Sequence, residues 1–228
     1  MPRAPRVQSA VGQVARAVRL ALYVVLGLLA VLTLSEVPAV SRWMRGWGPQ
    51  RPRVGILAGH WQNDSGAVCP DGLQEVEINL AVARRVAQAL REQGHDAEIL
   101  PEYSSMLDGY RAEAFVAIHS DSCLEGYSGF KIASLSGAPA PAASEQLRDD
   151  LHEAYALATG LASHPDTITD DMRQYHALRQ IDTSTPGVII ELGFMGGDRY
   201  LLTAEQDRVA VGIANGVMAF LRREEGQD

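Results

Sequence analysis

The sequence has no excess of basic residues. It contains 20 Lys and Arg against 28 Asp and Glu, which gives a formal net charge of −8 at pH 7. Residues 1–40 hold four arginines and one glutamate, so the rest of the chain has 16 basic and 27 acidic residues. Proteins that bind nucleic acid through its phosphates need a basic surface. The composition therefore argues against a nucleic-acid partner.

Cysteine and repeated segments are also scarce. Cys69 and Cys123 are the only cysteines, so the chain can form at most one internal disulfide. No segment recurs along the sequence, which argues against a repeat architecture. The chain has 228 residues, 46% of them hydrophobic. That length and composition suit either one globular domain with a sizeable core or a small domain with an appendage.

Long apolar runs are limited to one segment near the amino terminus, Leu20–Leu34 (LALYVVLGLLAVLTL). Extended to Val40, it is long enough to cross the hydrocarbon core of a bilayer. The four preceding arginines favour a cytoplasmic amino terminus. We therefore expect residues 1–19 to be a cytoplasmic leader and residues 20–40 an uncleaved transmembrane anchor. A cleaved signal peptide is the main alternative, a buried core helix is another, and the first two place the remainder outside the cytoplasm.

The segment after this run has the composition of a linker. Residues 41–52 contain two tryptophans together with Gly and Pro, a mixture that suits a short connection beside a membrane interface. We expect the folded domain to span residues 53–223 and to be followed by a short tail, residues 224–228.

Strand and helix patterns alternate in the expected domain. Short apolar stretches predict strands at 54–58, 96–101, 114–120, 129–135 and 186–194. Helical periodicity predicts one helix over 75–93, a second capped by Ser144, and a third that opens with a capping box at Thr203–Gln206. This alternation predicts an α/β three-layer sandwich, in which helices flank a mostly parallel mixed sheet.

Three of the predicted strands lead into a residue that can bind a proton or a metal, namely His60, His119 and Glu191. The carboxyl ends of parallel strands meet at one edge of a sheet, and Glu75 begins the helix that leaves the same edge. Two imidazoles and a carboxylate are a ligand set of catalytic zinc, with a fourth position open for water. A second carboxylate beside that water can act as its general base. The alternative for Glu191 is a structural ion pair with a nearby cation.

Four motifs of the sequence resemble, in the same order, those of the zinc-dependent N-acetylmuramoyl-L-alanine amidases. They are GILAGHWQNDSGA, GLQEVEINLAVARRVAQAL, AFVAIHSDS and TPGVIIELGFM, and the resemblance covers roughly residues 54–221. These enzymes hydrolyse the amide between N-acetylmuramic acid and the first L-alanine of peptidoglycan. By position, the resemblance implies one Zn²⁺ bound by His60, Glu75 and His119, with Glu191 as the catalytic residue. Glu77 is the alternative ligand from the first helix.

The chain departs from the family pattern in several loops. The usual Asp-Pro-Gly-His-Gly-Gly-like motif reads AGHWQ over residues 58–62, and the usual Ala-Asn after the second histidine is Ser120-Asp121. The Ser/Thr-Asn expected after the last strand is Gly196-Gly197, and the connection between the second and third strands is short. None of these departures removes one of the four site residues. They change loops that would contact substrate, so the resemblance does not define the exact substrate specificity.

Other residues near the expected site have less specific roles. Asp64 and Asp121 follow ligand positions, so each is a candidate acceptor that orients a ligand, or else a solvated loop carboxylate. His176 is a candidate to line the site or contact substrate, or else an exposed loop histidine. Cys69 and Cys123 flank the ligands and can form a disulfide outside the cytoplasm. Their alternatives are two inert thiols or a thiolate that competes for zinc.

Together, these features predict a membrane-tethered zinc amidase whose catalytic domain lies outside the cytoplasm and acts on peptidoglycan or muropeptides. If the amino-terminal segment is cleaved, the protein is secreted instead. No wall-binding repeat is visible in the sequence, so we expect targeting to come from the anchor or from partners. Whether a protein activator is among these partners stays open. One alternative is a zinc amidohydrolase or peptidase for a different amide. The other is a catalytically silent wall-binding scaffold on the same fold.

Overall fold

The structure is a computed structural model that describes residues 16, 18–25, 51–137 and 141–225. The chain divides into two units, residues 1–50 and 51–228. In the first unit, residues 16 and 18–25 are helical and exposed. Most of the predicted leader, anchor and linker lies outside the described residues. Within the described part, no helix combines the length and apolar character that a membrane crossing requires.

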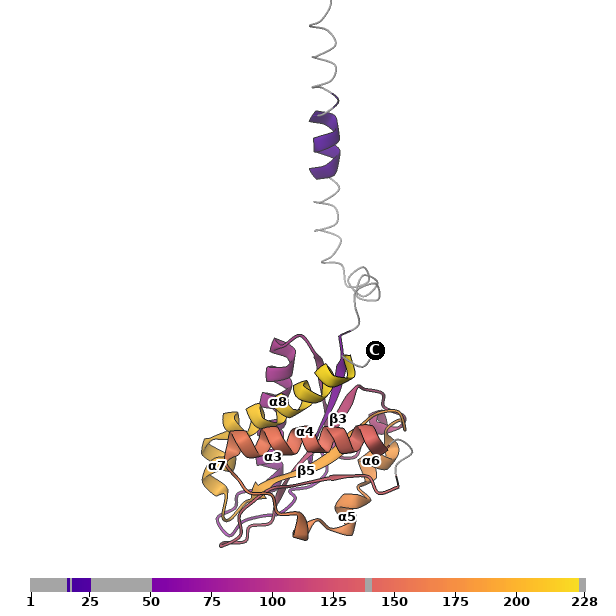
Figure 1. Ribbon diagram of the computed structural model, residues 1–228. Coiled ribbons are helices and arrows are strands. Elements are labelled where there is room, and N and C mark those ends of the chain that lie inside the picture. Colours follow the sequence, from indigo (N-terminus) through magenta and orange to yellow (C-terminus); the bar gives the residue numbers. More distant parts are fainter. Residues whose placement is uncertain (1–15, 17, 26–50, 138–140, 226–228) are drawn as a thin grey trace, which may run out of the picture. The chain divides into compact units, whose positions relative to one another are not determined.

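The second unit is built on a five-stranded sheet with the strand order β2-β1-β3-β5-β4. Figure 1 labels its neighbouring strands β3 and β5. Four strands run parallel, and β4 is antiparallel to its neighbour β5. The strands are β1 (Arg53–Ala58), β2 (Asp96–Pro101), β3 (Ala114–Asp121), β4 (Lys131–Ser134) and β5 (Gly187–Phe194). The predicted mostly parallel mixed sheet is confirmed.

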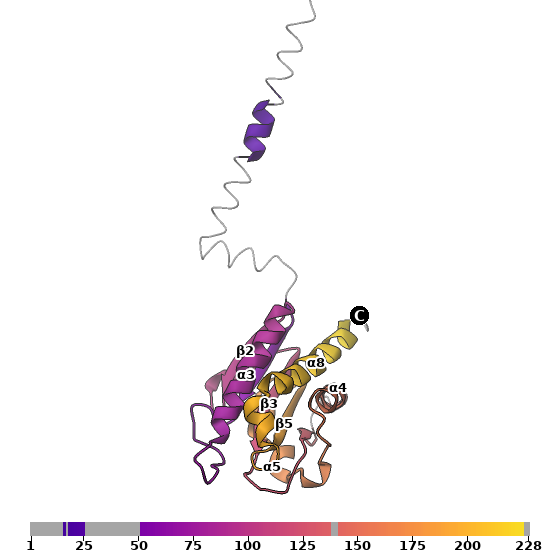
Figure 2. The ribbon, with the colours of Figure 1, turned by 90° about the vertical axis from the view of Figure 1, so that its left-hand side faces the viewer.

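The long helices pack on one face of this sheet, where α8 lies between α3 and α4 (Figure 2). With the short helix α7 they bury a large apolar core against residues such as Val54 and Ile56 of β1. The helices of this layer are α3 (Glu75–Glu92), α4 (Pro141–Thr159), α7 (Arg199–Ala204) and α8 (Gln206–Glu225).

Shorter segments cover the opposite face. Because successive strand residues point to opposite faces, Leu57 of β1 belongs to this second core, with Phe115 of β3. The segments that pack here are η1 (Ser105–Leu107), α5 (Asp170–Arg173) and α6 (His176–Gln180), while η2 (Pro165–Thr167) contacts β4. The predicted sheet flanked by helices is therefore present, with long helices on one face and short ones on the other.

Two predicted helix starts are wrong. Helix α4 begins at Pro141, since proline suits the first helical position. Ser144 lies inside the helix, where its hydroxyl accepts the Gly187 N–H at 3.1 Å. Thr203 belongs to α7, where its hydroxyl donates to the Arg199 carbonyl at 2.8 Å, and α8 begins only at Gln206. Neither hydroxyl caps the helix that was expected to follow, because that of Ser144 binds the distant β5 residue Gly187 and that of Thr203 binds the preceding turn of its own helix.

Candidate active site

His60 follows β1 after a sharp change in backbone direction. Its φ of 67° lies in the left-handed region, which residues other than glycine seldom adopt. Its N–H donates to the carboxylate of Glu102 at 2.7 Å, and the preceding N–H of Gly59 donates to Ile118 of β3 at 2.9 Å. A Cβ on Gly59 would lie 2.5 Å from the His119 ring. A glycine before His60 therefore lets the His119 ring pack directly against this turn.

Glu75 is the first residue of α3 and is 5% exposed. One carboxylate oxygen accepts hydrogen bonds from the Ser120 N–H at 3.2 Å and from the Asn79 side chain at 3.0 Å. The other accepts the Ala67 N–H at 3.1 Å. Glu77 instead accepts the Gln74 N–H at the helix start, at 3.3 Å. Of the two glutamates, the structure thus directs Glu75 into the site.

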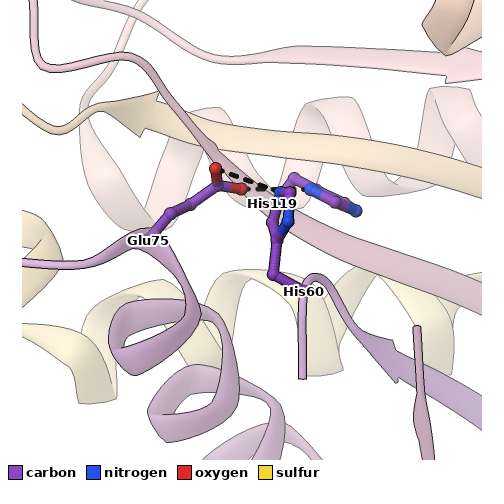
Figure 3. A group of neighbouring side chains, drawn as sticks. All are labelled: His60, Glu75 and His119. Carbon is purple, nitrogen blue, oxygen red and sulfur yellow. Dashed lines mark hydrogen bonds and ion pairs between the residues drawn. The ribbon is translucent and has the colours of Figure 1, made fainter. Parts of the chain in front are cut away.

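The carboxylate of Glu75 faces both histidines (Figure 3). Its Oε2 is 3.2 Å from His60 Nε2, and its Oε1 is 3.0 Å from His119 Nδ1. One ligand atom from each of the three residues lies within 4.8 Å of the others. Tetrahedral zinc with ligands at 2.0–2.2 Å places neighbouring ligand atoms roughly 3.3 Å apart. The residues, their atoms and their spacing all fit a zinc ion.

The charges of the three side chains also fit a cation. Burial opposes the charge of Glu75, but hydrogen bonds with His119 and His60 outweigh it and hold the pKa of Glu75 well below its usual range. Burial likewise disfavours a charged His119 ring, yet hydrogen bonds with Glu102 and Glu75 raise the pKa of His119 to about 10. A hydrogen bond with Glu75 raises the pKa of His60. Without a metal, protons on the histidines supply the positive charge that the carboxylate requires.

Glu191 lies on β5 beside this cluster. It is the register partner of His119 on one side and of Lys131 on the other. Its Oε2 is buried and has no hydrogen-bond partner among the described residues. This burial raises the pKa of Glu191 to about 7. A carboxylate with that pKa is suited to general-base catalysis near neutral pH.

The two candidate orienting aspartates have different surroundings. Asp64 lies 2.5 Å from Nδ1 of His60, so it is placed to orient that ring. Asp121 pairs with Lys131, the only lysine of the sequence, at 2.6 Å. The register between β3 and β5 shifts between His119 and Asp121, so that Asp121 is paired with Phe194 of β5. The prediction that Asp121 orients a ligand is not met in this arrangement.

His176 is a partly buried residue at the start of α6, which does not fit an exposed loop histidine. Its Nε2 is 2.7 Å from Oε1 of Glu102, and its ring stacks on Tyr103 with the centroids 4.3 Å apart. Glu102 and Tyr175, which also contact His119, were not predicted as site residues. Glu102 directly follows β2, and His60 lies two residues after the end of β1. The polar residue at the end of the second predicted strand was therefore a sequence signal that could have identified Glu102.

Cys69 and Cys123 form a disulfide in the structure. It joins the loop before Glu75 to the segment after β3. That segment also packs on Gly196 and Gly197, where an added Cβ would come within 2.4 Å of the Leu124 carbonyl oxygen and 1.8 Å of the Tyr127 carbonyl oxygen. The glycines that replace the family's Ser/Thr-Asn thus make room for this segment.

The family model of the N-acetylmuramoyl-L-alanine amidases, Amidase_3, matches residues 54–219. The chain belongs to this family. Amidase AmiC of Neisseria meningitidis is 29% identical over 163 residues, which are 65% of this chain and 39% of the relative. Protein YqiI of Bacillus subtilis is 29% identical over 180 residues, 73% of this chain and 84% of the relative. The match therefore spans well under half of the Neisseria amidase.

Solved amidase structures share the fold. The catalytic domain of the amidase CwlV from Bacillus (Paenibacillus) polymyxa var. colistinus superposes with a TM-score of 0.59 at 27% identity, covering 75% of this chain and 98% of that one. The Clostridioides difficile amidase CwlD, solved with the lipoprotein GerS, gives a TM-score of 0.60 at 20% identity, over 75% of this chain and 99% of that one. At that lower identity the likeness extends to the fold alone.

Proposed function

We propose that this amidase-family protein hydrolyses the amide bond between N-acetylmuramic acid and L-alanine in peptidoglycan. In this proposal His60, Glu75 and His119 bind one Zn²⁺, and Glu191 is the general base. The observation that carries the proposal is the convergence of these three side chains, whose ligand atoms lie within 4.8 Å of one another. One of them, His119, is the register partner of Glu191. Family membership supports the substrate class.

The protein's own groups account for the proton transfers. Bound zinc would lower the pKa of a water molecule and polarise the scissile carbonyl. Oε2 of Glu191 has no partner among the described residues, so it is free to accept a proton from the attacking water. The same carboxyl group then protonates the departing amine, because an amide nitrogen leaves poorly without a proton. Amide hydrolysis by this route thus requires one group that accepts a proton from water and then donates it to the leaving amine, and Glu191 is suited to both steps.

We also propose that the chain is tethered outside the cytoplasm by residues 20–40, with a cytoplasmic leader at 1–19 and a linker at 41–52. The arginines before an apolar run support this orientation. Amino-terminal sequencing of the mature protein tests it. A sequence that begins at Met1 or Pro2, in a membrane fraction, fits an anchor, whereas a start near Val40 fits signal-peptide cleavage.

Incubation of the full-length protein with purified peptidoglycan tests the activity. We expect the zinc-loaded protein to release stem peptides with a free amino-terminal L-alanine, as detected by mass spectrometry. Removal of the metal should abolish release, and added zinc should restore it. Release of fragments cut at another bond would contradict the proposed substrate bond. A zinc-loaded protein that releases nothing would favour the zinc amidohydrolase for a different amide or the silent scaffold.

A further inference from the structure

A buried carboxylate that the proposed reaction does not use lies next to the predicted zinc ligands. Glu102 directly follows β2 and is 4% exposed. It contacts three separate parts of the chain: the turn after β1, the end of β3 and the segment that leads into α6. Burial of a charged group costs free energy unless polar partners compensate it. The several polar partners of Glu102 therefore suggest a role beyond packing.

Glu102 holds the backbone of the first histidine. Its Oε2 accepts the His60 N–H at 2.7 Å, and its own N–H donates to the Trp61 carbonyl at 3.1 Å. His60 is one of two residues other than glycine with positive φ in the part of the chain that the structure describes. Such a conformation persists where the surroundings determine it. The two hydrogen bonds to Glu102 hold the turn that directs the His60 ring toward Glu75.

Glu102 also faces the ring of the second histidine. Because Nδ1 of His119 faces Glu75, Nε2 is the nitrogen left for a partner that orients the ring. Oε2 of Glu102 is 3.5 Å from this Nε2. The hydroxyl of Tyr175 is 2.9 Å from the same nitrogen and donates to Oε1 of Glu102 at 2.6 Å. The carboxylate therefore holds the ring through the tyrosine hydroxyl, and its own Oε2 lies at ion-pair distance from the same ring nitrogen.

We propose that Glu102 is a positioning residue that holds both histidines in their metal-binding orientation, His60 through its backbone and His119 through its ring. The inference rests on the proposed zinc site. Metal-binding histidines commonly donate their second ring nitrogen to a carboxylate, which fixes the ring and raises its basicity. Glu102 differs from such a partner in one respect, since it supports two ligands from different strands at once.

The chain offers a matched control for Glu102. Glu98 lies on β2, the strand that Glu102 directly follows, and it accepts a hydrogen bond from a tyrosine, Tyr110, at 3.0 Å. The substitutions Glu102→Gln and Glu98→Gln each remove one carboxylate charge and weaken one bond from a tyrosine hydroxyl. A loss that is specific to Glu102 therefore reports on the histidines and not on the stability of β2.

The test measures zinc affinity of the full-length variants by competition with a chromophoric chelator, and the visible spectrum of Co²⁺ bound in place of zinc. We expect Glu102→Gln to weaken zinc binding by roughly 10- to 100-fold and to change the Co²⁺ spectrum. Glu98→Gln should match the native protein in both. Tyr175→Phe removes only the bridging hydroxyl and should produce a smaller change in the same direction, so it decides the question if Glu102→Gln does not fold.

The outcomes separate this inference from the proposed function. A native protein that binds no zinc contradicts the zinc site and everything that rests on it. Native-like affinity and spectrum in Glu102→Gln, with zinc bound by the native protein, would overturn the positioning role alone. An equal loss in Glu98→Gln would also overturn it, because the effect would then come from the strand.

Discussion

Glu191 and His119 are direct register partners on the adjacent parallel strands β5 and β3. The predicted base and one predicted zinc ligand are therefore placed relative to each other by the hydrogen bonding of the sheet itself. A shift of one residue in this pairing would turn one side chain to the opposite face. The site thus depends on the pairing of these two central strands, while the turn after β1 supplies His60 and the start of α3 supplies Glu75.

The first prediction separates the two glutamates at the start of α3. Glu75→Gln should reduce zinc affinity by more than roughly 100-fold, because the loss of a ligand exceeds the usual effect of losing a ligand's partner. Glu77→Gln should leave zinc binding unchanged and cost about 1 kcal/mol or less of stability, since it only weakens the capping interaction with Gln74. Metal analysis after dialysis measures both. Retention of zinc in Glu75→Gln with loss in Glu77→Gln would reverse the assignment.

The second prediction concerns the stability of the metal-free protein. Glu102 and Glu75 raise the pKa of His119 to about 10, above its ordinary value of about 6.5. A raised histidine pKa stabilises the folded state fully below pH 6.5, and this contribution is lost as the pH rises toward 10. We expect the urea midpoint of the metal-free protein to fall over that range, by a free energy on the order of a few kcal/mol.

Two controls accompany this measurement. Zinc binding requires a neutral imidazole, so the zinc-loaded protein should show little of this decline. The variant His119→Gln, without metal, should lose the same dependence because the titrating group is gone. A midpoint in the native metal-free protein that stays constant between pH 6.5 and 10 would contradict the described arrangement of charges.

The third prediction concerns the disulfide between Cys69 and Cys123, which closes a loop with a sequence separation of 54. A chain-entropy estimate for such a loop is about 4 kcal/mol, and measured losses are typically about 2–4 kcal/mol. The double substitution of both cysteines by serine should lower the free energy of unfolding by that amount and also weaken zinc binding, because the loop leads into Glu75. Peptide mapping without reductant should show the two cysteines linked. Free thiols in protein isolated from its native compartment would exclude this role.

Most of the fold could be predicted from the sequence because short apolar strands and an amphipathic helix carry clear periodicity. The predicted strand at residues 96–101 has the bounds of β2, and His60, Glu75 and His119 meet as the shared strand edge requires. The starts of α4 and α8 could not be placed, since a serine or threonine hydroxyl can also lie inside a helix. There it can bind the preceding turn, as Thr203 does, or a distant strand, as Ser144 does.

The surroundings of the site were harder to predict. Glu102 has its partners Tyr175 and His176 more than 70 positions away along the chain, and no local pattern links such residues. Asp121 pairs with Lys131 at a point where the register of β3 against β5 shifts, and the alternation of apolar residues encodes neither feature. The requirement for glycine at positions 196 and 197 comes from the segment that packs against them, which is distant in the sequence.

The most direct test of the central claim compares the native full-length protein with Glu191→Gln, both loaded with zinc. The substitution keeps the shape of the side chain and removes its ability to accept the proton of water. We predict equal zinc content in both proteins, and release of stem peptides from peptidoglycan slowed by roughly 10²- to 10⁴-fold in the variant. Unchanged release by Glu191→Gln at equal zinc content would show that Glu191 is not the general base and would contradict the account.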